Sequence, residues 1–505
     1  MKAKQLLALL LALLTLMSVL VSCGGDQDTD VQTGDKETGN AVESGSDETE
    51  VMHNLPADLN FASNSNPIIT FFVRTGGLYE QEMYVEEVTE DTLPDAIYWR
   101  NQTVQNQLGV EIQQIAQLCG WSNYSDWNST LRNAIQTETH DFDMAAIYAG
   151  TGSSLAIEDC YMDLADLEYL GLDKPWWNQS LLEVATIYNS LYFAAGSITP
   201  TQLADANVLY FNKDLYNEYF ATSGRKDIYD VVRDGDWTID YMYDITSQIW
   251  EDADSNGEHS SGDTLGFVGS AKQDNGAMDS WFYALGCNLT VMDESVGEPV
   301  AAFYDEHTIQ AYEKLVKLYG DNEGAWALTE SGQSHGDTSF TNGNAMMTLA
   351  KFSTGSSYRE VNFAFGVLPV PKFDTEQTSY IAIPEVTSSM VTILSTVEDE
   401  RLDMVSATVE LMAAESYKTV IPTYTEVVLK SKQANAPEDA EMVQTIIDSM
   451  VYSFGWIFSS THMADMGKTF RVVDGSRDIS NLYLSKKDAY EAAIEGLIDA
   501  FASLP

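Results

Sequence analysis

The chain is poor in cysteine and lacks several well-known motifs. Four of its 505 residues are cysteine, and no two of them form a C-x-x-C pair, which leaves a cysteine-based metal site unsupported. Apart from Cys23, the cysteines are Cys119, Cys160 and Cys287, an odd number that allows at most one internal disulfide. Buried free thiols are therefore expected. Neither an H-E-x-x-H pair nor a P-loop occurs, so these zinc-peptidase and nucleotide-binding signatures are missing.

Positive charge is also scarce. The chain has 26 lysines and arginines against 77 aspartates and glutamates, which gives a formal net charge of −51. Such a field repels nucleic acids and anionic membrane surfaces, so neither is expected as a partner of the folded part. Hydrophobic residues make up 44% of the chain, enough for a large core in two or three domains.

The one long apolar run lies at the start of the chain, over Leu6–Leu20. It follows Lys2 and Lys4 and ends in small residues, which is the pattern of a secretory signal. The run is shorter than the stretch of about 20 apolar residues that a membrane-spanning helix needs. The tetrapeptide Leu20-Val21-Ser22-Cys23 resembles the lipobox of bacterial lipoproteins. That resemblance implies cleavage before Cys23 and a diacylglycerol on its thiol, whereas an ordinary signal beside a chance cysteine is the alternative.

Residues 23–66 are rich in acidic residues, threonine, serine and glycine, and we predict a disordered acidic tether there. Beyond it, apolar runs at Ile68–Val73, Val110–Ile112 and Asp141–Tyr148 predict strands. Helical periodicity over Ala96–Leu108 and Trp127–Gln136 places helices between them. This alternation indicates an α/β domain with a parallel sheet.

The rest of the chain continues the α/β pattern. We predict strands at Val208–Phe211 and Phe363–Leu368, and a helix over Tyr241–Trp250 capped by Thr238, next to a core Trp237. Trp176 and Trp177 are assigned to a surface turn. Further helices are predicted over Thr308–Tyr319, Glu398–Ala414, Glu438–Met450 and Ser485–Ala502.

An ordered series of segments resembles the extracellular solute-binding proteins of ABC importers, of the carbohydrate-binding, maltose-binding-protein-like family. The segments include FDMAAIY, ANVLYFNKDLY, DGDWTIDYMYDIT, FTNGNAMMTLA and FAFGVLPVPKF. The resemblance implies a two-lobed periplasmic-binding-protein fold of type II, with a ligand cleft between lobes joined by a multi-crossing hinge. It places residues 67–204 plus 378–414 in lobe 1, and 205–377 plus 415–505 in lobe 2.

The same resemblance implies a function without catalysis. The protein would capture a carbohydrate, expected to be an oligosaccharide, and deliver it to the transmembrane subunits of an ABC permease. It would act as a monomer on the extracellular face of the cell membrane, held there by the Cys23 lipid alone. A surface-anchored glycoside hydrolase and a glycan-adhesion module without a permease are the alternatives.

Sugar binding needs flat aromatic faces for C–H-rich rings and planar polar groups for hydroxyls. Loops after strands are where such groups should gather. For each aromatic candidate the alternative is core packing, and for Asp205 it is a solvated hinge position. The ligand-binding candidates are Arg74, Thr75, Tyr148, Thr151, Asp205, Trp281, Phe352 and Trp456.

One segment fits a calcium loop, with the pattern D-x-[DN]-x-[DN]-G and an acid at the twelfth place. Gly257 permits the tight turn, but an aspartate replaces the usual twelfth-place glutamate and His259 fills an apolar place. A polar loop without metal is the alternative. No cofactor is required, and calcium would be structural, away from the cleft. The metal candidates are Asp252, Asp254, Asn256, Glu258 and Asp263.

Enzyme signatures are weak. Gly332–Gly336 matches G-x-S-x-G, and a nucleophile elbow needs a strand before it and a helix directly after it. The residues from Ala325 are a poor strand pattern and those from Asp337 start no clear helix, so no elbow is expected, although His462 could formally complete a triad. Gly150-Thr151-Gly152 is followed by Leu155 where a dinucleotide fingerprint has glycine or alanine. A glycosidase carboxylate pair is compatible with so acidic a chain, but no motif specifies one.

Overall fold

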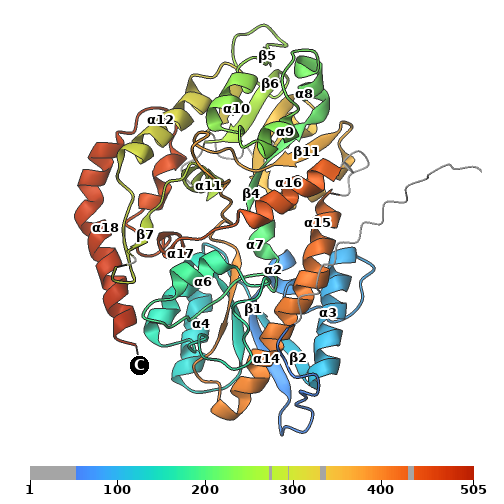
Figure 1. The fold of residues 1–505 in the computed structure, drawn as a ribbon, viewed down its shortest axis with the longest axis vertical. Helices are drawn as coiled ribbons and strands as arrows, with labels where there is room; N and C mark the ends of the chain where they lie inside the picture. The colour runs from blue at the N-terminus through green and yellow to red at the C-terminus, as the bar shows by residue number, and fades with distance from the viewer. Residues whose placement is uncertain (1–52, 272–275, 294, 330–336, 430–436, 505) are drawn as a thin grey trace, which may run out of the picture. The chain divides into compact units, whose positions relative to one another are not determined.

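The computed structural model describes residues 53–271, 276–293, 295–329, 337–429 and 437–504 (Figure 1). The predicted signal peptide, Cys23 and most of the predicted tether lie outside the described residues, as does Gly332–Gly336. Contrary to the expectation from the sequence, a strand (Ala325–Leu328) precedes that segment and a short helix (Asp337–Thr341) follows it. Within the described part, no helix is both long and apolar enough to cross a membrane.

The end of the predicted tether is packed against the folded part, so the predicted boundary at residue 66 is too late. Leu55 is buried, and the Phe61 amide donates to the Leu108 carbonyl at 2.7 Å. Leu55 and Phe61 supply the apolar surface for this packing.

The first sheet has the strand order β12-β3-β1-β2. Strand β1 (Ile68–Arg74) pairs in parallel with β2 (Glu111–Gln117) and β3 (Met144–Tyr148), as the sequence predicts. Strand β12 (Ser389–Ile393) joins the sheet antiparallel to β3. Every residue of β3 and β12 is buried, which is typical of strands covered on both faces.

Helices α3 (Thr92–Leu108) and α4 (Tyr124–Gln136) belong to the same α/β unit. The predicted helix over Ala96–Leu108 is confirmed, and it begins four residues earlier. It ends where Gly109 adopts the left-handed conformation, with φ +66°, and donates its amide to the Gln105 carbonyl. Glycine suits this position because it carries no Cβ.

The second sheet has the order β11-β4-β10-β6-β5, with β9 paired to β6. Strand β4 (Asn207–Asn212) lies between β10 (Ala345–Lys351) and β11 (Phe365–Leu368) and is antiparallel to both. Strand β6 (Thr264–Ser270) runs parallel to β10 and to β9 (Ala325–Leu328). The helices of this α/β unit are α8 (Lys213–Phe220), α10 (Ile239–Thr246) and α12 (Glu306–Gly320). A separate two-stranded antiparallel sheet is formed by β7 (Thr290–Asp293) and β8 (Glu298–Ala301).

The helix predicted over Tyr241–Trp250 is too long. Thr238 caps it as predicted by accepting the Tyr241 amide, but α10 ends at Thr246 and Trp250 lies in β5 (Trp250–Glu251). The helix ends early because the backbone of β6 comes very close to its last residue. A Cβ placed on Gly266 of β6 would lie 2.1 Å from the Thr246 carbonyl oxygen. Strand β6 therefore passes where another helical turn would lie.

The surface turn predicted for Trp176 and Trp177 is also wrong, because both indoles are at most 2% exposed. The Ser197 amide donates to the Trp176 carbonyl at 2.8 Å, and the Trp177 indole N–H donates to Glu410 of helix α14 (Asp399–Glu415) at 3.0 Å. Trp237, predicted in the core, is fully buried and its indole donates to the Pro369 carbonyl at 2.9 Å.

Three chain segments lie side by side where the chain passes between the two sheets. Ala206 pairs with Pro384 in an antiparallel bridge, and Ala382 pairs with Met450 in a parallel bridge. The Glu385 amide also donates to the Asp205 carbonyl at 3.0 Å. The sequence predicts a hinge of several crossings, and these three segments have that arrangement; the lobe boundaries themselves stay a prediction.

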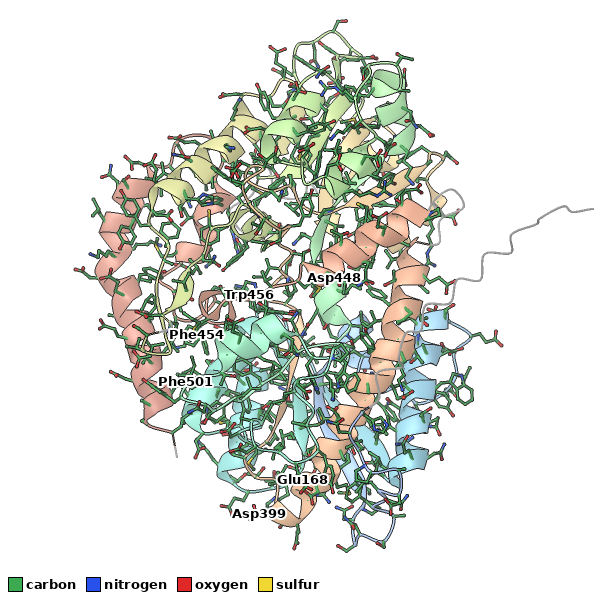
Figure 2. The ribbon with its side chains drawn as sticks, in the orientation of Figure 1. Glu168, Asp399, Asp448, Phe454, Trp456 and Phe501 are labelled. Atoms are coloured by element: carbon green, nitrogen blue, oxygen red, sulfur yellow. The ribbon has the colours of Figure 1, made fainter. Side chains whose placement is uncertain are left out.

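Two long helical elements lie near the end of the chain. Helix α14 continues through a π-helical turn, Ser416–Val420, into α15 (Ile421–Leu429). Helix α18 (Ile479–Ala502) brings Phe501 to 6.0 Å from Tyr192, between ring centroids. Phe454 and Phe501 are labelled in Figure 2, and the centroids of their rings are 6.3 Å apart.

Glu82, at the end of α2 (Gly77–Gln81), is fully buried beside the first of these crossings. Its carboxylate accepts the Thr201 hydroxyl at 2.7 Å. Burial raises the pKa of Glu82 to about 7, and the hydrogen bond of Ser389 and the charge of Arg74 offset only part of that effect.

A raised pKa favours the protonated carboxyl, so its stabilising contribution is complete below about pH 4.5 and is lost as the pH rises through about 7. We therefore predict that Glu82→Gln, which keeps the acceptor for Thr201, makes the protein more stable at pH 8 by on the order of 3 kcal/mol. At pH 4 the two proteins should be nearly equal. Urea unfolding at both pH values measures this, with the exposed Glu87→Gln as the control; a stability difference independent of pH would contradict it.

Candidate functional site

A cavity of about 850 Å³, called the central cavity below, draws its lining from both sheets and from the crossing segments. Tyr148 ends β3, Asn207 begins β4, and residues 383–387 precede β12. Trp456 comes from α17 (Phe454–Ile457), while Lys468 and Arg471 come from the 3₁₀ helix Met466–Arg471. The volume falls in the upper part of the range of roughly 300–1,000 Å³ for small-molecule sites.

Asp279 and Arg471 form a two-pronged ion pair in the cavity wall. The Arg471 Nε and Nη2 atoms lie 2.7 and 2.5 Å from the two Asp279 carboxylate oxygens. Burial raises the pKa of Asp279, although the Arg471 hydrogen bonds and charge act in the opposite direction. Lys468, in the same wall, has its ammonium 2.6 Å from Asp465. The charges of the cavity are therefore paired.

Asn207 presents a buried amide to the central cavity. It is 3% exposed, and its Nδ2 atom donates to Glu385 at 3.4 Å. Within the described residues its Oδ1 atom has no hydrogen-bond partner. A buried acceptor without a donor costs about 1–3 kcal/mol. The oxygen itself is shielded from solvent in this structure, so a ligand hydroxyl would gain that free energy once the Asn207 side chain turned toward the cavity.

Three aromatic side chains complete the lining. Tyr148 and Trp456 are each 2% exposed, whereas Trp121 is 56% exposed. Ser453 caps the short helix of Trp456 by accepting its amide, and Tyr452 meets the Trp456 ring edge-on at 5.1 Å. Burial raises the pKa of Tyr148 to about 12, so its hydroxyl stays protonated and able to donate.

Of the predicted ligand residues, Tyr148 and Trp456 line the central cavity. Arg74 lies behind it: its guanidinium donates to the Ser389 hydroxyl at 2.7 Å and sits 5.1 Å from the centroid of the Tyr148 ring. Thr151 is 1% exposed, and the Thr75 amide donates to the Gln117 carbonyl at 3.0 Å. The Arg74, Thr75 and Thr151 side chains are outside the lining.

Asp205 is a buried part of the crossing rather than a cavity wall or a solvated hinge residue. It is 4% exposed, and its carboxylate accepts Tyr79 at 2.7 Å, Lys351 at 2.9 Å and Thr387 at 2.9 Å. Burial alone would lower the pKa of Lys351, but Asp205 and Glu385 outweigh it and raise that pKa. Lys351 therefore stays charged within this network.

Trp281 and Phe352 do not face the central cavity, contrary to the prediction. Trp281 is fully buried, with its indole N–H donating to the Tyr319 hydroxyl at 3.2 Å. It lies in α11 (Asp279–Ala284), whose first turn exposes Asp279 to the cavity instead. Phe352 is fully buried, with its ring 5.9 Å from that of Tyr424.

Sequence reasoning missed several lining residues, namely Trp121, Asn207, Asp279, Glu385, Lys468 and Arg471. Two had a usable signal. Asn207 opens the recognised strand ANVLYF, and Asp279 is two residues before Trp281 in DSWFYALG. The others lie in loops or short turns, where periodicity carries no information about orientation.

The predicted calcium loop forms a compact turn between β5 and β6. One carboxylate oxygen from each of Asp252, Asp254 and Asp263 can lie within 4.8 Å of the others. Asp263 is fully buried and accepts the Ala253 amide at 3.0 Å and the Ser260 amide at 2.8 Å. The Asn256 side chain donates to Asp254 at 3.0 Å. Glu258 is exposed and outside this trio. Calcium binding stays a prediction.

Comparison with known proteins shows the fold. No protein-family model and no curated protein matches the chain. An ABC substrate-binding protein from Listeria monocytogenes, in complex with cycloalternan, has a TM-score of 0.51 at 15% identity and covers 87% of this chain and 99% of its own. A cyclo/maltodextrin-binding protein with maltotetraose has a TM-score of 0.52 at 12% identity and covers 87% and 97%.

UgpB from Mycobacterium tuberculosis, in complex with glycerophosphocholine, has a TM-score of 0.52 at 11% identity and covers 85% of this chain and 99% of its own. At such identities the likeness concerns the fold. The chain has the two-lobed α/β fold of the ABC solute-binding proteins, as the ordered segments predict. The first sheet and its helices form one lobe and the second sheet the other, so the central cavity lies between lobes.

The calcium prediction can be tested by stability. An ion that binds the folded chain alone stabilises it by about 2.7 kcal/mol at one hundred times its Kd. We expect millimolar Ca²⁺ to raise the melting temperature of EDTA-treated protein by several degrees, and Asp254→Asn to reduce that rise. Asp321→Asn, at an exposed helix end, is the control. Melting curves that coincide with and without Ca²⁺ would refute the prediction.

Proposed function

We propose that the protein is the solute-binding lipoprotein of an ABC importer, which captures a carbohydrate outside the cell and presents it to a permease. The observation that carries this proposal is the buried Asn207 side-chain oxygen, which has no hydrogen-bond partner among the described residues and belongs to a residue that lines the interlobe cavity. A sugar hydroxyl would satisfy that oxygen, while Tyr148 and Trp456, each 2% exposed, add only a small apolar area to the lining. The fold supports ligand capture, because closure of two lobes around a ligand needs a hinge, and the crossing segments between the two sheets have that arrangement.

A neutral ligand suits this cavity best. Asp279 is paired with Arg471, Lys468 with Asp465, and Glu385 with Lys351 at 3.1 Å. An anionic ligand would meet no net positive charge there and would approach a chain of net charge −51. The cavity volume of about 850 Å³ favours an oligosaccharide over a single ring.

The pairing of the carboxylates also favours binding over hydrolysis. A glycosidase needs one protonated carboxyl to donate to the leaving oxygen and a second carboxylate close to it. Asp279 is held by two hydrogen bonds from Arg471, and Glu385 by Lys351 and Asn207. Both are arranged to orient neutral hydroxyls and to keep the cavity walls in place.

Calorimetry of the purified full chain against a panel of mono- and oligosaccharides tests this function. We expect at least one neutral sugar to bind without turnover, and Asn207→Ala to weaken that binding by about tenfold because the buried acceptor is lost. Asn342→Ala, at an exposed site, should leave the Kd unchanged. Product formation from a bound sugar, or equal affinity in both variants, would contradict the proposal.

The membrane anchor has its own test. We propose that a lipid on Cys23 holds the protein near its permease and so keeps its local concentration high. Cys23→Ala should move the protein from the membrane pellet to the culture medium, while Cys119→Ala, which removes a buried thiol, should not. Retention of the Cys23 variant in the pellet after carbonate washing would refute the anchor.

A further inference from the structure

Trp121 combines two properties that the other tryptophans of the central cavity and the core do not share. It lines the cavity, yet it is 56% exposed. Trp456, in the same lining, is 2% exposed and is already covered by protein. Trp99 has a similar exposure of 59%, but it lies on α3 outside the lining. Trp121 therefore stands at the mouth of the cavity, with a large apolar surface left in water.

The backbone holds Trp121 in this position. It lies between β2 and α4, in a turn where the Asn123 amide donates to the Gly120 carbonyl at 3.1 Å. The Asn123 side chain closes the same turn by accepting the Gly120 amide at 2.6 Å. The Tyr124 ring lies 5.6 Å away, tilted by 43°, and supports the indole from one side. The exposure of Trp121 thus belongs to a built turn and not to a loosely placed loop.

The Lys468 ammonium lies over the Trp121 indole. The ammonium is 5.9 Å from the centroid of the Trp121 ring, near the outer limit of about 6 Å for a cation–π contact. Trp121 comes from the loop after β2 and Lys468 from the 3₁₀ helix Met466–Arg471, and both line the cavity. Because Asp465 pairs with the ammonium at 2.6 Å, a ligand can take the place over the ring without leaving that charge unpaired.

We propose that Trp121 forms an outer sugar subsite at the mouth of the central cavity, in addition to the inner site between Tyr148, Asn207 and Trp456. This inference rests on the proposed function and deepens it by assigning the length of the ligand. A single ring bound at Asn207 leaves the exposed indole uncovered. A linear oligosaccharide that continues toward the mouth stacks its next ring on Trp121 and removes that apolar surface from water.

The outer subsite predicts that affinity depends on chain length through one side chain. Calorimetry of the full chain is carried out with linear glucose, xylose, mannose and galactose oligomers of one to four rings. For the series that binds, we expect Trp121→Ala to weaken the binding of three- and four-ring members about tenfold and to change the single-ring Kd less than twofold. Trp121→Phe, which keeps an aromatic face, should recover most of the loss. Trp99→Ala is the matched control and should change neither the single-ring Kd nor the Kd of the longer members.

Fluorescence gives a readout that a purely structural role would not change. Binding of a four-ring oligomer should shift the emission of the wild type to shorter wavelength and protect it from iodide quenching, and Trp121→Phe should lose this response although it still binds. Trp99→Phe should retain the response. Equal loss of affinity for all lengths in Trp121→Ala, or a full response in Trp121→Phe, would overturn the outer subsite. If the wild type binds no member of any series, the proposed carbohydrate function fails instead.

Discussion

The buried charge cluster around Asp205 is the constraint on which the arrangement of the two lobes depends. Its carboxylate accepts hydrogen bonds from Tyr79, Lys351 and Thr387, and Lys351 also pairs with Glu385. Tyr79 belongs to the first lobe, Lys351 ends a strand of the second, and the other three lie on crossing segments. Burying a charge is costly unless its partners are in place, so the cluster is stable only when all these segments meet.

The same cluster sets the walls of the ligand cavity. Lys351 holds one oxygen of Glu385, and the other oxygen accepts Asn207. The amide is thereby oriented with its Oδ1 atom unsatisfied among the described residues. Two bonds thus separate the hinge from the group that we assign to ligand recognition. Any rearrangement of the crossings moves Glu385, and through it the acceptor that a ligand would use.

Sequence reasoning recovered the fold better than the site. The parallel part of the first sheet is predicted by the alternation of strands and helices. That alternation can be read from the sequence because periodicity and the glycine at a helix end depend only on neighbouring residues. The antiparallel β12 was not predicted, since its partner β3 is distant in sequence. Tyr148 was found because it ends a clear strand, whereas Trp281 was misplaced because one aromatic in a short helix has no periodicity to orient it. Lys468 and Arg471 lie in a 3₁₀ turn whose sequence shows no pattern.

The way the first lobe is completed has a consequence for when the protein can fold. Arg74 bonds Ser389 across 315 residues of chain, Arg100 bonds Ser416 across 316, and Arg401 bonds the Ile68 carbonyl across 333. Contacts so distant in sequence form slowly, because a long loop must close before they are made. During synthesis the first three strands therefore lack these partners until β12 and α14 have been made. Such a delay suits the export that the proposed function requires, because a chain that has not yet folded can still be threaded through a membrane channel.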